Sequence, residues 1–137
     1  MATRGAIILV CAAAVVLVGG WLRSDRRCEG AVRTLFVYGA THRGSEPSVR
    51  RAVGLVAHDC AVATVATESQ QLRLAGRPGL ALLLARKATG RGTRSFDAWL
   101  ALGDAERALG REILAANAWS RAWRLNPRWQ PPVVRLP

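Results

Sequence analysis

The chain has 137 residues, and 20 Lys and Arg residues against 9 Asp and Glu residues give it a formal net charge of +11. This length suits one small domain. Lys87 is the sole lysine, and the arginines that follow Arg4 are scattered from Arg23 to Arg135. A nucleic-acid interface gathers basic residues on one face with aromatic residues between them, so the scatter argues against nucleic acid as a partner.

The first segment predicts a membrane anchor. No charged residue occurs from Ala6 to Leu22. A helix of this length spans roughly 25 Å, which is enough to cross a hydrocarbon core. Trp21 lies where an indole suits the membrane interface. A cleaved signal peptide is the alternative, but the segment ends without a small-x-small cleavage site. We therefore expect an uncleaved, single-pass anchor over residues 1–23.

A helix–turn–helix pattern extends from Trp99 to Pro127. Large and small residues alternate at helical spacings, so each helix offers knobs and holes to the other. Gly110 allows the chain to reverse, and a proline ends the second helix because it lacks an N–H. The predicted packing residues are Trp99, Leu102, Gly103, Ala115, Trp119, Ala122 and Pro127.

These seven residues fall at positions 4, 7, 8, 20, 24, 27 and 32 of a 34-residue unit, and the pattern resembles the tetratricopeptide repeat. The resemblance implies a repeat over residues 96–129, with Glu106 standing where the family has an aromatic residue. A shift of 34 positions predicts a degenerate repeat over residues 62–95, in which Glu68 and Ser69 replace Leu102 and Gly103.

Residues 24–61 predict a further helical hairpin in front of the repeats. Its first helix carries apolar residues at helical spacing, namely Ala31, Val32, Leu35 and Phe36. Its second helix opens on Ser45 as a cap with Pro47 in the first turn, and then presents Ala52, Val53 and Val56 on one face. Residues 130–137 form a Pro-rich, extended tail. The predicted fold class is all-α: an anchor helix followed by a short superhelical array of helical hairpins.

Two cysteines indicate on which side of the membrane the domain lies. Cys28 and Cys60 flank the predicted hairpin, whose antiparallel helices bring such ends together. A disulfide there closes a loop of about 33 residues and contributes about 3 kcal/mol. Disulfides persist outside the cytoplasm. The positive-inside rule opposes this placement, since Arg23, Arg26 and Arg27 follow the anchor and only Arg4 precedes it. We favour an extracytoplasmic domain in a bacterial cell envelope.

The sequence offers little for catalysis. His58, Asp59 and Cys60 are adjacent, and adjacent helical residues do not face each other. A zinc site from Cys28, His42, His58 and Cys60 has suitable atoms but lacks the short paired spacings of structural zinc sites. No phosphate-binding loop or paired carboxylate is evident. We expect no catalytic residue, metal, cofactor or small-molecule substrate.

The resemblance implies that partners bind along the first helix of each repeat. The positions so indicated are Ala66, Gln70, Arg73, Asp97, Leu100, Asp104 and Arg107. The alternative is that these are ordinary solvated residues. Trp129 lies at the end of the array, where an uncovered apolar edge is a second candidate contact. The sequence therefore predicts a membrane-anchored module for protein–protein interaction, serving as an adaptor, assembly factor or accessory subunit.

A second functional class stays open. The Arg-rich surface could bind anionic ligands, either nucleic acid or acidic lipid, from a membrane-tethered position. A redox role for Cys28 and Cys60 is a third possibility, but no Cys-x-x-Cys pair supports it.

Overall fold

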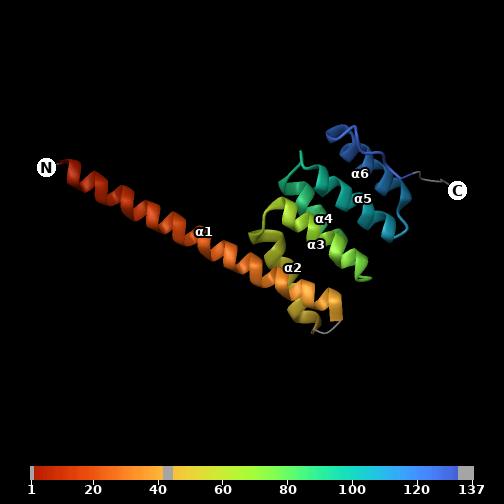
Figure 1. The fold of residues 1–137 in the computed structure, drawn as a ribbon, viewed down its shortest axis with the longest axis horizontal. Coiled ribbons are helices and arrows are strands. Elements are labelled where there is room, and N and C mark those ends of the chain that lie inside the picture. The colour runs from red at the N-terminus through yellow and green to blue at the C-terminus, as the bar shows by residue number, and fades with distance from the viewer. Residues whose placement is uncertain (1, 42–44, 133–137) are drawn as a thin grey trace.

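The computed structural model describes the backbone of residues 2–41 and 45–132, and the side chains of residue 20 and of residues 22–41 and 45–132. All regular secondary structure in these residues is α-helical, which confirms the predicted all-α class (Figure 1). The helices are α1 (Ala2–Thr41), α2 (Glu46–Asp59), α3 (Val62–Leu74), α4 (Pro78–Arg91), α5 (Phe96–Ala108) and α6 (Glu112–Leu125).

Helix α1 is one continuous helix of 40 residues. Its N-terminal part extends away from the other helices, and its C-terminal part packs beside α2 (Figure 1). The domain boundary expected after Arg23 falls within this helix. Among the residues that the structure describes, no helix is both long and apolar enough to cross a membrane. Most side chains of the expected anchor, residues 6–22, lie outside that set.

The hairpin of α1 and α2 forms around two apolar stripes. Ser45 caps α2 by accepting a hydrogen bond from the backbone N–H of Ser48 at 3.4 Å. One prediction for α1 is wrong: Phe36 is 66% exposed, whereas Tyr38 is only 3% exposed. Helical spacing allows two stripes here, and the one through Ala31, Leu35 and Tyr38 is the one that packs in the core, which leaves Phe36, about 100° away from Leu35, exposed. The buried residues of α2 are Val49, Ala52, Val53, Val56 and Ala57.

The two following hairpins have the same dimensions. Every bound of α5 and α6 lies 34 positions after the corresponding bound of α3 and α4. The turns agree as well, since Gly76 and Gly110 have φ angles of 74° and 73°. In each turn a backbone N–H donates a hydrogen bond to the carbonyl five positions earlier. Arg77 donates to Leu72 at 2.9 Å, and Arg111 donates to Glu106 at 3.0 Å. Glycine adopts this left-handed conformation without the steric cost that a Cβ imposes.

The helices stack in sequence order. α3 packs on α4, α4 on α5 and α5 on α6, and α3 also lies against α5 (Figure 1). Contacts of α1 with α3 and of α2 with α4 join the first hairpin to this stack. Much of the core is alanine, which lets the helices approach closely; the fully buried alanines are Ala81, Ala85, Ala88, Ala98, Ala105, Ala115 and Ala122.

The stack ends at α6. The backbone N–H of Asn126 donates to the carbonyl of Ala122 at 3.0 Å, and Pro127 follows directly. Residues 130–132 have no regular structure, and residues 133–137 of the expected tail lie outside the described residues. The outer side of α6 carries apolar side chains that are 47–69% exposed: Ile113, Leu114 and Trp123.

Candidate functional site

The α5–α6 pair is built around one close contact. A Cβ placed on Gly103 would lie 2.3 Å from Cδ1 and from Nε1 of Trp119. Trp119 is 1% exposed and is the largest fully buried side chain among the described residues. Glycine at position 103 therefore creates the space that the indole fills, and the indole ring is fixed between the two helices.

The same indole positions a polar group at the surface. Trp119 donates from Nε1 to Oδ1 of Asp104 at 3.1 Å, and the guanidinium of Arg107 lies 5.7 Å from the centre of the indole ring. Arg73 of α3 joins them, so that Arg73, Asp104, Arg107 and Ala108 line one hollow of about 340 Å³. We refer to these four residues as the α3–α5 hollow.

The α3–α5 hollow is lined by more positive than negative side chains. Burial raises the pKa of the Asp104 carboxyl, while the hydrogen bond from Trp119 and the charges of Arg73 and Arg107 oppose that rise. The buried Nε of Arg73 has no hydrogen-bond partner within the described part of the chain. Two guanidinium groups face one carboxylate, so the hollow has donors left for a ligand that brings acceptors.

The remaining residues predicted for this surface are distributed unevenly. Gln70 and Leu100 are half-buried, Asp97 is exposed in the first turn of α5, and none of the three lines the hollow. Ala66 is 1% exposed, so its expected place on an open binding face is wrong. It falls on the same buried stripe of α3 as Val65 and Ser69.

The aromatic residues at the end of the array contact nearby chain. Trp99 donates from Nε1 to the carbonyl of Thr93 at 2.8 Å, and the guanidinium of Arg121 lies 4.6 Å from its ring centre. Trp129 is half-buried and meets Phe96 edge to face, with the ring centres 5.6 Å apart. The segment directly after α6 thus covers the start of α5, while the outer side of α6 keeps its exposed apolar residues.

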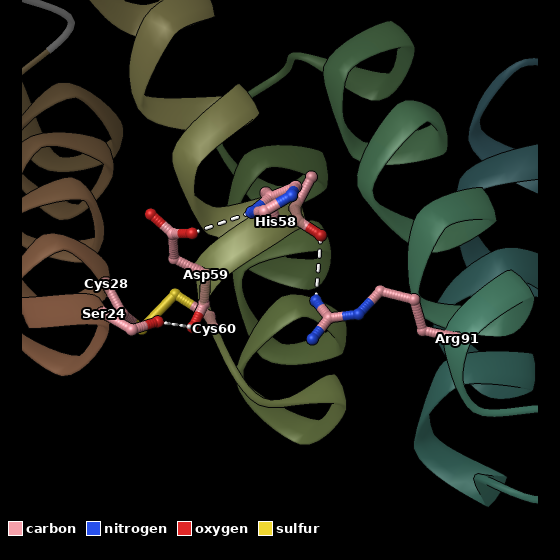
Figure 2. The surroundings of a disulfide bond; sticks show 7 residues. Ser24, Cys28, His58, Asp59, Cys60 and Arg91 are labelled. Carbon is pink, nitrogen blue, oxygen red and sulfur yellow. Dashed lines mark hydrogen bonds and ion pairs between the residues drawn. A yellow bond between two sulfur atoms is a disulfide. The ribbon is translucent and has the colours of Figure 1, made fainter. Parts of the chain in front are cut away.

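The structure confirms the predicted cysteine pair. Cys28 of α1 and Cys60 after α2 form a disulfide with their Cα atoms 5.1 Å apart (Figure 2). Beside it, the Ser24 hydroxyl donates to the carbonyl of Asp59 at 3.3 Å, and Arg91 of α4 donates to the carbonyl of Ala57 at 2.9 Å. The first hairpin is therefore closed covalently and is linked to α4 by a hydrogen bond.

The disulfide leaves neither sulfur free to bind zinc or to act as a nucleophilic thiol. Both sulfurs are bonded to each other, and Cys60 is 1% exposed. His58 contacts Asp59 through Nδ1 at 2.8 Å, and His42 lies outside the described residues. Within the described part of the chain, no three His, Cys, Asp or Glu side chains gather in a way that could hold a metal ion.

The sequence did not predict the role of Glu106. Its side chain is 5% exposed and accepts from Arg86 at 3.1 Å and from Arg111 at 3.3 Å. Arg86 belongs to α4 and Arg111 precedes α6, so one carboxylate connects three helices. An acidic residue at a position expected to hold an aromatic core residue, in a chain rich in arginine, is the pattern that could have indicated this ion-pair cluster.

Glu68 is buried without such partners. The residue is 6% exposed, and Oε2 has no hydrogen-bond partner among the residues described. Burial raises the pKa of this carboxyl. Its neighbour Ser69 donates to the carbonyl of Ala81 at 2.8 Å and thereby joins α3 to α4.

Comparison with known proteins gives no assignment: no family model, no curated protein and no solved structure matches this chain.

Proposed function

We propose that this chain is a single-pass membrane protein whose domain contains two units of the tetratricopeptide type and binds a protein partner at the α3–α5 hollow. It would act as an adaptor, an assembly factor or an accessory subunit. The observation that carries the proposal is the hollow itself, which Arg73, Asp104 and Arg107 line from two helices, with Arg107 over the buried ring of Trp119.

Several features favour a protein partner. Arg73 and Arg107 occupy equivalent positions 34 residues apart, so the two units offer the same kind of donor at a repeated interval. Both lie on helices whose packing fixes their spacing, and rigid helices lose little conformational entropy on binding. An extended or helical segment of a partner presents backbone carbonyls and side-chain acceptors at comparable intervals.

Covalent crosslinking in cells tests this surface. We would place a photo-crosslinking residue at Ala108, which lines the hollow, and separately at Asn117, which is exposed on α6. We expect a discrete adduct from position 108 alone. The combined variant Arg73→Gln and Arg107→Gln should remove it, whereas Arg94→Gln with Arg124→Gln, which removes the same charge elsewhere, should not. Identical adducts from both positions, or an adduct indifferent to Arg73 and Arg107, would overturn the proposal.

The compartment forms part of the proposal. The Cys28–Cys60 disulfide supports an extracytoplasmic domain in a cell envelope. The arginines that follow the anchor count against it under the positive-inside rule. Alkylating free thiols before lysis and measuring the mass of the cysteine peptides without reductant decides between them. We expect a linked peptide pair, and two alkylated thiols would place the domain in the cytoplasm.

A further inference from the structure

The arginines that follow the apolar segment line two adjacent hollows. Arg23, Arg26 and Arg27 surround one hollow together with Leu22. Arg26 and Arg27 also line a second hollow of about 290 Å³ between α1 and α2, which includes Arg51 of α2. Arg26 and Arg27 line both hollows, so the two lie next to each other along α1 between Leu22 and Arg51. We call the two together the arginine groove.

The arginines of this groove form no ion pair with the described carboxylates. Among the described residues that line either hollow, there is no Asp or Glu. Within the described part of the chain, the arginines that form ion pairs are Arg50, Arg77, Arg86 and Arg111, none of which belongs to the groove. Asp25 and Glu29 are exposed on α1 but do not line either hollow. The guanidinium groups therefore keep their donors for a ligand.

The groove also has open space between its charged walls. A Cβ placed on Gly30 would meet no atom within 4 Å, while Ala31 and Ala52 supply a small, buried floor. Arg26 and Arg27 come from α1 and Arg51 from α2, and the disulfide holds these two helices together. A planar guanidinium pairs with phosphate oxygens through two parallel hydrogen bonds, so several such groups around one space suit a phosphate group.

The position of the groove identifies the source of that phosphate. Arg27 lies five residues beyond Leu22 in one continuous helix, which is about 7.5 Å at about 1.5 Å per residue. The headgroup region of one leaflet is roughly 5–7.5 Å thick. If the segment Ala6–Leu22 spans the hydrocarbon core, Arg23, Arg26 and Arg27 therefore fall within it, at the depth of the lipid phosphates. Figure 1 shows that α1 extends outward from the domain on this side.

We propose that the arginine groove binds the phosphate of an anionic phospholipid headgroup and thereby fixes the domain against the membrane surface. The inference rests on the proposed anchor, but not on the α3–α5 hollow. It gives the arginines that follow the anchor a role on whichever side of the membrane the domain lies. Arg51 belongs to α2 and lines only the second hollow.

The test uses the 137-residue chain in a non-ionic detergent, with dioctanoyl phosphatidylglycerol as the probe and bound lipid counted by native mass spectrometry. The variant replaces Arg26, Arg27 and Arg51 by Gln. The matched control replaces Arg94, Arg124 and Arg128 by Gln, which are exposed and remove the same charge. We expect the groove variant to lose phosphatidylglycerol affinity by about tenfold or more, and the control by less than about twofold.

Three results would overturn the inference. Equal losses in the two variants would mean that diffuse charge, and not the groove, attracts the lipid. Equal affinity for phosphatidylcholine or for inorganic phosphate would remove the anionic headgroup as the ligand. A DNA duplex that competes fully at the same ionic strength, with the same loss in the groove variant, would identify a general polyanion site.

Failure of the anchor is measured separately. Alkaline carbonate extraction of membranes reports whether the chain is integral, and release into the soluble fraction would overturn the anchor whatever the lipid counts are. Retention in the membrane together with lost phosphatidylglycerol binding in the groove variant supports both proposals. The adduct from position 108 should persist in the groove variant, because that site lies on α3 and α5.

Discussion

The α3–α4 and α5–α6 pairs share their dimensions and turns but bury different side chains at equivalent positions. Where the second pair sets Gly103 against Trp119, the first has Ser69 and Ala85. Gly103 leaves room for an indole, whereas Ser69 uses its hydroxyl to bond the carbonyl of Ala81 at 2.8 Å. A small residue is thus needed at this position in both pairs, and the facing residue decides whether a hydroxyl can be accommodated.

The buried carboxylates differ in the same way. Glu106 is equivalent to Leu72, and it is tolerated in the core because Arg86 and Arg111 reach it. Glu68 is equivalent to Leu102, and its Oε2 has no partner among the described residues. In both pairs the turns determine the backbone, while the interior accepts unusual residues whose effect on stability depends on their local partners.

The largest expected effect follows from removing the space at position 103. Gly103→Ala places a methyl group 2.3 Å from the ring of Trp119, which is 1% exposed and cannot move aside. We expect the free energy of unfolding to fall by about 3 kcal/mol. Urea unfolding of the chain in detergent, followed by far-UV circular dichroism, measures the loss.

The control for this variant is Gly90→Ala, at an exposed helical position where a Cβ would meet nothing within 4 Å. It should gain up to about 1 kcal/mol because alanine favours the helix. The double variant Gly103→Ala with Trp119→Ala resembles the arrangement of the first pair, so it should lose less than the sum of the two single changes. Strict additivity would contradict the proposed contact.

The second effect concerns the carboxylate shared by three helices. Glu106→Gln removes a charge that two arginines bond, and we expect a loss of about 2 kcal/mol. Glu46 is a matched control, since it also pairs with two arginines, Arg50 and Arg77, but its side chain is 46% exposed. Glu46→Gln should cost less than about 0.5 kcal/mol, because water competes for exposed pairs. Chemical unfolding measures both, and equal losses would show that burial does not strengthen the Glu106 cluster.

Much of the fold could be predicted because helix ends depend on local chemistry. Ser45, Pro47 and the glycines of the turns act within a few residues, and the pairing of Cys28 with Cys60 follows once an antiparallel hairpin is recognised. The exposure of Phe36 and the burial of Ala66 could not be obtained in this way. They depend on which neighbouring helix covers each face, and one sequence does not specify the rotation of a helix about its axis.

The candidate site was predictable only in part. Arg73, Asp104 and Arg107 were selected by their positions in the repeat, and the structure brings them together. Gln70, Asp97 and Leu100 were selected on the same basis and do not line the hollow. The difference arises from Trp119, whose Nε1 holds Asp104 and whose ring lies beneath Arg107. Sequence spacing indicates the face of a helix but not such a side-chain contact.

A third, smaller effect has the opposite sign. Glu68→Leu installs the residue found at the equivalent position 102 and removes a buried carboxyl whose Oε2 lacks a partner among the described residues. We expect a gain of roughly 1–2 kcal/mol at neutral pH. The pKa of Glu68 is raised in the folded state, so the folded chain holds this proton more tightly than the unfolded chain. Its contribution to stability is therefore present at low pH and is lost as pH rises from the ordinary carboxyl pKa through the folded value.

The pH dependence provides the check on this variant. Unfolding should be measured from about pH 4 to 7, where the difference between the chain and Glu68→Leu should grow as pH rises. Glu68→Gln separates the charge from the apolar gain, because it removes the titration and keeps the shape. A constant difference between the chain and Glu68→Gln across this range would contradict a raised pKa.

The smallest effect concerns the end of the array, where the two pairs are covered differently. At the start of α3, Val62 is covered by the segment that follows α4. A Cβ placed on Gly92 of that segment would lie 2.7 Å from Cγ1 of Val62. At the equivalent start of α5, Phe96 is covered by Trp129, which comes from the segment after α6.

Trp129→Ala should lower the free energy of unfolding by about 1 kcal/mol, the range of an edge-to-face aromatic contact. It should also increase self-association, measured by sedimentation at several protein concentrations, because Phe96 then joins the exposed apolar residues of α6. Trp123→Ala, on the open side of α6, is the matched control: it removes an indole that is already 48% exposed, so it should reduce self-association without lowering stability by as much. If Trp129→Ala changes neither quantity, the segment after α6 does not act as a cover, and the first pair differs from the second only in its interior.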